Sequence, residues 1–111
     1  MTPPTGTFLA PVRNGAMRIP APLKEYCDAE SWSLFRFDII DRDHLTMYPV
    51  LPKDSRANFD ACLSPDGLLW IPADVRKSLA LGEQSVMLRI EGSAIQVYVR
   101  KVFDTLGFRP G

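Results

Sequence analysis

GAMRIPAPLK (residues 15–24) and GLLWIPADVR (residues 67–76) are two versions of one pattern, and they lie 52 residues apart. Each version starts with glycine, places an apolar residue before Ile-Pro-Ala, and follows this triplet with an aliphatic residue and a base. A second match, LTMY (45–48) over IQVY (95–98), holds at a spacing of 50. The first copy therefore carries about two extra residues before this strand, as a turn of variable length would. A repeat fixes the architecture more firmly than local propensity does, so we interpret the chain as a duplication.

Each copy predicts a turn, a short strand and a helix. Asn14 and Asp66 precede the two glycines, and such pairs favour a tight turn between strands, a hairpin or a bulge. The apolar residues that follow predict strands that end at proline, whose fixed φ suits the first turn of a helix. Pro22 should shorten the first helix, and Gly82 is a natural stop for the second.

A β-hairpin should follow each helix. We expect strands at 31–40 and 45–48 around the turn 41–43, and at 86–90 and 95–100 around 91–93. Residues from Pro49 to Asn58 show little periodicity and predict a linker. The predicted organisation is one domain over 1–111, with repeats at 7–49 and 59–103, a linker at 50–58 and a flexible tail at 104–111.

Composition favours a single folded domain inside the cell. The apolar fraction is 46%, and 13 basic residues balance 13 acidic ones, so binding of nucleic acid would need a local basic cluster. Cys27 and Cys62 lie far apart without a CxxC pattern, which favours buried free thiols in a reducing compartment. Residues 1–6 do not resemble a signal peptide, and no apolar run could span a bilayer. We expect a cytoplasmic protein without a membrane partner, associated with the nucleoid if it binds DNA.

The glycine turn, apolar strand, Ile-Pro, short helix and final glycine of 67–82 resemble the signature of the SpoVT/AbrB family, and 15–26 repeats it. Two copies in one chain are similar to the MraZ proteins, bacterial regulators of division and cell-wall genes. The resemblance covers roughly residues 7 to 103. It implies a mainly β protein with short helices (α+β), in which two tandem strand-helix-hairpin repeats form a swapped-hairpin (double-split) β-barrel. It also implies a homo-oligomer that binds duplex DNA through turns of the form Asp-x-x-Gly-Arg and regulates transcription.

Both glycine turns depart from that family pattern. The corresponding segments are VRNGA (12–16) and SPDGL (64–68), so the glycines are present while the Asp and the Arg are missing from both. Arginine can hold guanine edges or phosphate with two hydrogen bonds, which Ala16 and Leu68 cannot do. Arg13 and Arg18 are close enough in sequence to replace it in the first copy, whereas the second copy has Pro65 and Trp70 at those places.

Two functional hypotheses therefore stay open. A DNA-binding regulator would use a basic cluster at the turns and helix starts, whose members are Arg13, Asn14, Arg18, Lys24, Arg76 and Lys77, around the turn glycines Gly15 and Gly67. Otherwise these charges are solvated, and the protein is an oligomeric scaffold or interaction module. Leu68 and Trp70 flank Leu69 in an alternating strand, so they predict either an exposed apolar patch that serves as a subunit or partner interface, or ordinary barrel core.

The remaining chemistry-bearing residues do not predict a reaction. His44 lies next to the charged turn residues Asp41 and Asp43, without a second histidine or clustered cysteines, so no metal site is expected. Cys27 has no evident base beside it, the segment 64–66 is a turn, and there is no glycine-rich phosphate loop. We expect neither an enzyme nor a cofactor nor a small-molecule substrate.

Overall fold

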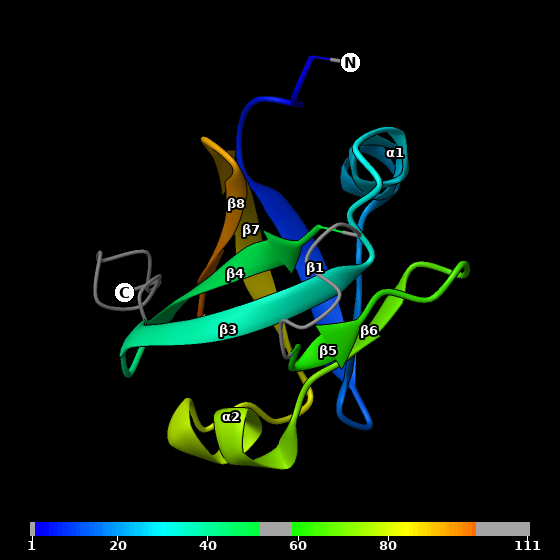
Figure 1. Cartoon of the computed structure of the whole chain (residues 1–111). Coiled ribbons are helices and arrows are strands. Elements are labelled where there is room, and N and C mark those ends of the chain that lie inside the picture. The colour runs from blue at the N-terminus through cyan, green and yellow to red at the C-terminus, as the bar shows by residue number, and fades with distance from the viewer. Residues whose placement is uncertain (1, 52–58, 100–111) are drawn as a thin grey trace.

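The computed structural model describes residues 2–51 and 59–99 and shows a mostly β protein with two short helices (Figure 1). The first half contains β1 (Phe8–Arg13), β2 (Ala16–Arg18), α1 (Ala21–Ala29), β3 (Leu34–Asp41) and β4 (His44–Val50). The second half contains β5 (Ala61–Cys62), β6 (Leu68–Trp70), α2 (Ala73–Ser78), β7 (Gln84–Glu91) and β8 (Ala94–Tyr98).

All eight strands found in the described part of the chain belong to one antiparallel sheet that curls into a nearly closed barrel. The strand order is β5-β3-β4-β8-β7-β1-β2-β6, and a single bridge between Leu63 and Leu69 joins its two ends. Closure of this kind leaves few unpaired strand edges. The helices lie on the outside of the barrel, α1 and α2 at different ends (Figure 1).

Strands from the two halves of the chain are interleaved in this sheet. Besides the hairpins, β1 pairs with β7, β3 with β5, β2 with β6 and β4 with β8. In the β2–β6 ladder Met17 lies opposite Leu69, and in the β4–β8 ladder Thr46 lies opposite Gln96. These are corresponding positions in the two halves, so the strand order reads the same when the halves are exchanged.

The two predicted hairpins are present, with shifted ends. β4 extends to Val50 and pairs its Pro49 with Phe35, so the first residue of the predicted linker belongs to a strand. The strand predicted over 95–100 ends at Tyr98. β1 and the two-residue β5 were not among the predicted strands, because they lie outside the repeated motif. The rest of the predicted linker, 52–58, and the predicted tail lie outside the described residues.

The extra length of the first half is not confined to a turn. Between Ile39 and Asp41 the β3–β4 register shifts by one residue, whereas the β7–β8 register is regular. Ile40 is therefore the added residue of a β-bulge, and it is 53% exposed. The other extra residue lies between the start of α1 and β3.

Two predictions about the helices are wrong. Pro22 does not shorten α1, which has nine residues against six in α2, because proline is tolerated in the first turn where its missing N–H would have no partner. Gly82 does not end α2, which stops at Ser78, and Ala80 takes the left-handed conformation with φ 53°. The Ile-Pro prolines, Pro20 and Pro72, are the N-cap residues of the helices.

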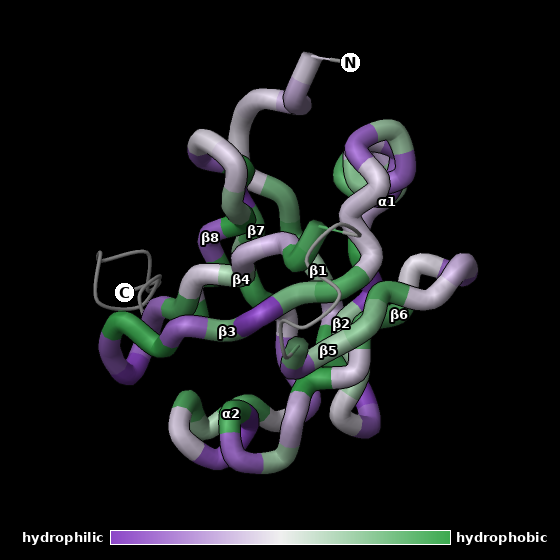
Figure 2. The backbone as a smooth tube through the Cα atoms, in the orientation of Figure 1, coloured by the Kyte–Doolittle hydropathy of each residue, from purple (hydrophilic) through white to green (hydrophobic). Residues whose placement is uncertain are grey.

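The interior of the barrel is apolar. Phe35, Met17, Leu69 and Leu88 are among its largest fully buried side chains, and the hydropathy colouring in Figure 2 shows green segments along the strands. α1 adds Leu23 and Tyr26, and the ring of Tyr26 meets that of Trp32, just after the helix, edge to face at a centroid distance of 5.3 Å. Burial of this kind is the dominant stabilising contribution in a small domain.

The two cysteines differ in exposure. Cys27 in α1 is fully buried as expected, but Cys62 in β5 is exposed, so the expectation of two buried thiols is wrong for Cys62. Burial, reinforced by the carboxylate of Asp28, raises the pKa of the Cys27 thiol from 9.0 to about 12. The two thiols should therefore differ in reactivity, since the thiolate is the nucleophile.

We expect an aromatic disulfide reagent at neutral pH to label Cys62 in the native protein and to label Cys27 only after denaturant is added. Cys62→Ser should abolish native labelling, and Cys27→Ala should leave it intact. Rapid labelling of Cys27 without denaturant would contradict this description of α1.

Because the pKa of the Cys27 thiol is higher in the folded state, the stability that the protonated thiol contributes is complete below pH 9.0 and is lost as the pH rises toward 12.

Candidate functional site

The residues singled out from the sequence converge on the outer face of the β2–β6 ladder. Met17 and Leu69 are buried in the barrel, and successive side chains of a strand alternate between faces. Their neighbours Ala16, Arg18, Leu68 and Trp70 therefore point outward, with Ala16 opposite Trp70 and Arg18 opposite Leu68. We call these four residues, with the two glycine turns beside them, the ribbon face.

The Gly15 turn forms one end of the ribbon face. Arg13 pairs with Ala16 across a two-residue loop, and Asn14 (φ 52°) and Gly15 (φ 82°) both have positive φ, the pattern of a type I′ turn. The guanidinium of Arg76 in α2 packs on Gly15, because a Cβ built there would lie 3.1 Å from Arg76 Cζ. Arg13 and Asn14 are exposed at this end.

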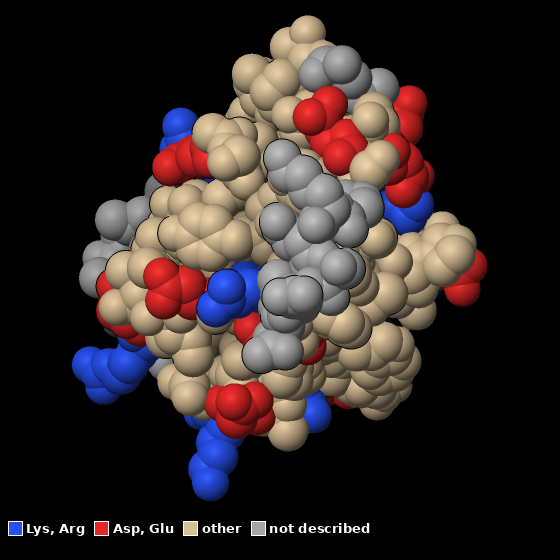
Figure 3. All heavy atoms as spheres, viewed as in Figure 1, with Lys and Arg blue, Asp and Glu red and all other residues tan. Residues whose placement is uncertain are grey.

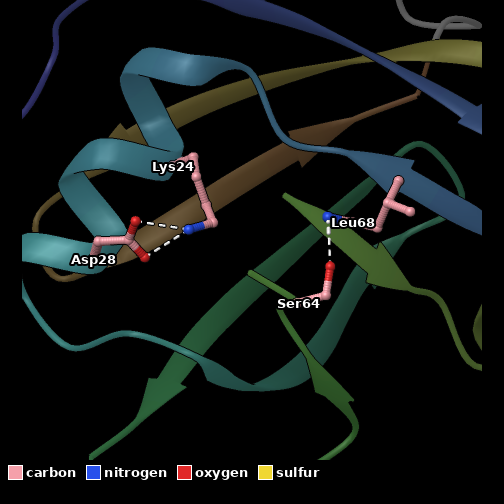
Figure 4. A network of polar contacts seen from close by, with 4 residues as sticks. All are labelled: Lys24, Asp28, Ser64 and Leu68. Atoms are coloured by element: carbon pink, nitrogen blue, oxygen red, sulfur yellow. Dashed lines mark hydrogen bonds and ion pairs between the residues drawn. The ribbon is translucent and has the colours of Figure 1, made fainter. Parts of the chain in front are cut away.

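The Gly67 turn forms the other end, with a different loop. Ser64 and Leu68 close a three-residue loop: Gly67 N donates to Ser64 O at 3.0 Å and Leu68 N donates to the Ser64 hydroxyl at 3.1 Å (Figure 4). Gly67 has φ 87°, as the last loop residue of such hairpins requires. Arg18 Nη1 donates to Asp66 O at 3.4 Å, so this arginine of the first half lies beside the turn of the second.

Backbone hydrogen bonds tie each turn to the opposite half. Ile19 N donates to Gly67 O at 2.7 Å, and Ile71 N donates to Gly15 O at 2.8 Å. Each Ile-Pro step is thereby fixed against the glycine turn of the other half, and the helix that follows starts beside that turn. A shallow groove lined by Arg18, Lys24 and the Gly67 turn results at one end.

Each end of the ribbon face has one acidic group next to the basic residues. Lys24 Nζ forms an ion pair with Asp28 at 2.6 Å (Figure 4), and Asn14 N donates to the Glu83 carboxylate at 3.2 Å. Arg76 Nε is bound to Ile71 O at 3.0 Å. Figure 3 likewise shows basic and acidic side chains interspersed on the face in view. Arg13 and Arg18 are therefore the basic residues best placed to meet a ligand from the ribbon face.

The apolar residues of the ribbon face lie between these charges. Trp70 is 58% exposed and Leu68 is half-buried, whereas Ala16 is buried between its neighbours. Leu68 and Trp70 thus share one surface with Arg13 and Arg18. Lys77, the last predicted basic residue, is exposed in the final turn of α2, next to Arg76 in the chain.

His44 belongs to a separate polar cluster on the β4–β8 ladder. Its Nε2 lies 2.6 Å from Gln96 Oε1, which also accepts from the Thr46 hydroxyl at 2.8 Å, and its ring stacks on Tyr98 at 4.5 Å. These contacts satisfy the buried hydroxyl of Thr46 and the half-buried polar groups beside it, where the two halves meet. Within residues 2–51 and 59–99 no group of three or more His, Cys, Asp or Glu side chains is arranged to hold a metal ion.

Comparison with known proteins found no family model that matches the chain and no matching curated protein. Among the described residues, no helix is both long and apolar enough to cross a membrane.

Sequence reasoning missed the cross-half placement of Arg18. Counting along the chain assigns Arg13 and Arg18 to the first turn and leaves the second without an arginine. The β2–β6 pairing instead places Arg18 beside the Gly67 turn, while Arg13 stays at the Gly15 turn, on which Arg76 of α2 also packs. Only the pairing of the two repeats with each other carries this information.

Proposed function

We propose that this chain is a DNA-binding protein of the SpoVT/AbrB and MraZ kind, which lays the ribbon face on duplex DNA and acts as a homo-oligomer in the cytoplasm. One observation supports it best: Arg13 and Arg18, from different strands, lie on the same outward face of the β-ribbon, one at each end. A role in transcription regulation follows from the family resemblance. Neither catalysis nor a cofactor is part of the proposal.

The interleaved strands support the repeat interpretation behind this proposal. In a swapped-hairpin barrel each repeat inserts its hairpin between strands of the other, and the observed order, with β1 beside β7 and β3 beside β5, is the order expected of two such repeats. The hydrogen bonds of Ile19 N to Gly67 O and of Ile71 N to Gly15 O are likewise exchanged when the two halves are exchanged. Neither half could bury its apolar face alone.

The shape and chemistry of the ribbon face suit the major groove. That groove of B-DNA is wide enough to admit a two-stranded β-ribbon, and β-ribbon proteins read bases from it. Arg18 can donate two hydrogen bonds to guanine, while Leu68 can contact a thymine methyl group. We assign phosphate contacts to Arg13, at the end of the ladder, and to Lys77 on α2; such contacts position a protein without specifying sequence.

A salt titration of duplex binding tests the proposal. Because this face presents only a few basic groups, we expect micromolar or weaker binding that falls steeply as salt rises, through release of counterions. Fluorescence anisotropy with labelled duplex would measure it, and light scattering should show assembly above the monomer. The same duplex at high salt is the control. Absence of measurable binding at low salt would remove the DNA function.

The exposure of Trp70 favours a second candidate, a scaffold that associates through the ribbon face without binding DNA. Large exposed aromatic side chains are enriched at protein interfaces. A partner seated on Leu68 and Trp70 would cover Arg18, so the face cannot serve both roles at the same time. If Trp70→Ser reduces the oligomer measured by light scattering and the wild type does not bind DNA, this second candidate is the better description.

A further inference from the structure

The ribbon face is nearly symmetric about the pairing of Met17 with Leu69. Exchanging the two halves places Gly15 on Gly67, Ala16 on Leu68 and Lys24 on Arg76, which keeps the glycine, the apolar character and the positive charge. The exchange fails at one outward position, where Arg18 corresponds to Trp70. Both side chains are exposed, so the difference is presented to whatever meets this face.

The loops repeat this difference. The Gly15 end carries Arg13 on the strand before the turn, and the place that corresponds to it at the Gly67 end holds Pro65. One end therefore combines Trp70 in the ladder with Arg13 at the margin, since both lie next to Ala16. The other combines Arg18 in the ladder with Pro65 at the margin. Among the strands, each end therefore has one arginine, which lies within the β2–β6 ladder at one end (Arg18) and on β1 at the other (Arg13).

Arginine and tryptophan recognise different features of a duplex. An arginine guanidinium can bind O6 and N7 of guanine with two parallel hydrogen bonds. A tryptophan ring has one N–H donor and a large apolar surface, which suits a thymine methyl group or an unstacked base. A palindromic duplex would present the same base to both residues, and one of them would be mismatched.

On the basis of the proposed DNA function, we propose that the two ends of the ribbon face read different half-sites, so that the chain selects an asymmetric duplex and binds it in one orientation. Arg18 specifies guanine in one half-site. Trp70 makes an apolar contact in the other, and Arg13 adds a phosphate contact at that end. Position 18/70 is therefore the specificity-determining difference between the repeats.

Selection from a randomised duplex library tests this proposal with the wild-type chain and with Trp70→Arg. We expect an asymmetric motif from the wild type, with guanine in one half only. Trp70→Arg places arginine at both corresponding positions and should yield a palindromic motif with guanine in both halves. Ile40→Arg, which replaces an equally exposed apolar residue on the β3 bulge, adds the same charge elsewhere and should keep the asymmetric motif. Circular dichroism would verify that the variants are folded.

The failures of the two proposals are distinguishable. If the wild type retains no duplex at low salt, the DNA function fails and this inference fails with it. If the wild type binds duplexes but selects a palindromic or featureless motif, the DNA function stands and the asymmetric reading is overturned. If Ile40→Arg changes the motif as Trp70→Arg does, net charge and not the position of the arginine decides the selection, which also overturns it.

Discussion

Leu69→Ala is expected to lower the free energy of unfolding by about 2–5 kcal/mol, the range for truncating a fully buried leucine. Leu69 is completely buried, lies opposite Met17 at the centre of the β2–β6 ladder, and forms the bridge with Leu63 that closes the barrel. The cavity would open where the two halves join, and β5 contributes only two residues to close it. Few neighbouring side chains could therefore move in to fill the cavity.

Leu68→Ala is the matched control, because it deletes the same atoms one residue away. Leu68 is half-buried and points outward, so its loss should cost about 1 kcal/mol or less. Urea denaturation followed by tryptophan fluorescence would give both values, with the slope of the transition as a check that unfolding stays two-state. Equal costs at the two positions would contradict the assignment of Leu69 to the interior and Leu68 to the ribbon face.

The repeated motif carried most of the local structure. Glycine after Asn14 or Asp66 predicted a turn, and both turns are present. Each turn needs a residue with positive φ at this position, which glycine adopts without strain. Ile-Pro predicted the start of each helix, since proline favours an extended residue before it and tolerates a helix after it. These features depend on neighbours in the chain, so one sequence is enough to infer them.

The features that were missed depend on contacts between the halves. The bulge at Ile40 shifts the β3–β4 register, and in the sequence it is visible only as the change in spacing between the two repeats from 52 to 50 residues. Cys62 is exposed because it lies between the buried Ala61 and Leu63, and successive residues of a strand point to opposite faces; β5 is too short for the sequence pattern to reveal this. The position of Gly82 favoured a helix end, but α2 stopped earlier and Leu79 was buried as its C-cap instead.

The electrostatic character of the candidate site was predictable only in part. The Lys24–Asp28 pair could have been inferred, since residues four apart on a helix are neighbours. The contact of Asn14 with Glu83 joins residues 69 positions apart and could not. Both reduce the positive potential at the turns, which leaves a larger share of any DNA binding to Arg13 and Arg18.

Arg18→Ala is expected to weaken binding to the selected duplex by about 1–3 kcal/mol and to remove the preference for guanine, as loss of a two-bond base contact does. Arg13→Ala should act differently, because Arg13 lies at the margin of the ladder where phosphates would pass. It should weaken binding to all duplexes similarly and reduce the slope of log affinity against log salt by about 1.

Salt titrations of both variants on selected and scrambled duplexes would separate these effects, with Arg42→Ala at the tip of the β3–β4 hairpin as the control. Arg42 is an exposed arginine outside the ribbon face, so its removal should leave affinity and salt slope near the wild-type values. A loss for Arg42→Ala as large as for Arg18→Ala would mean that binding follows overall charge. In that case the ribbon face would not be the DNA-binding surface, and the exposed Trp70 would be better explained as a protein contact.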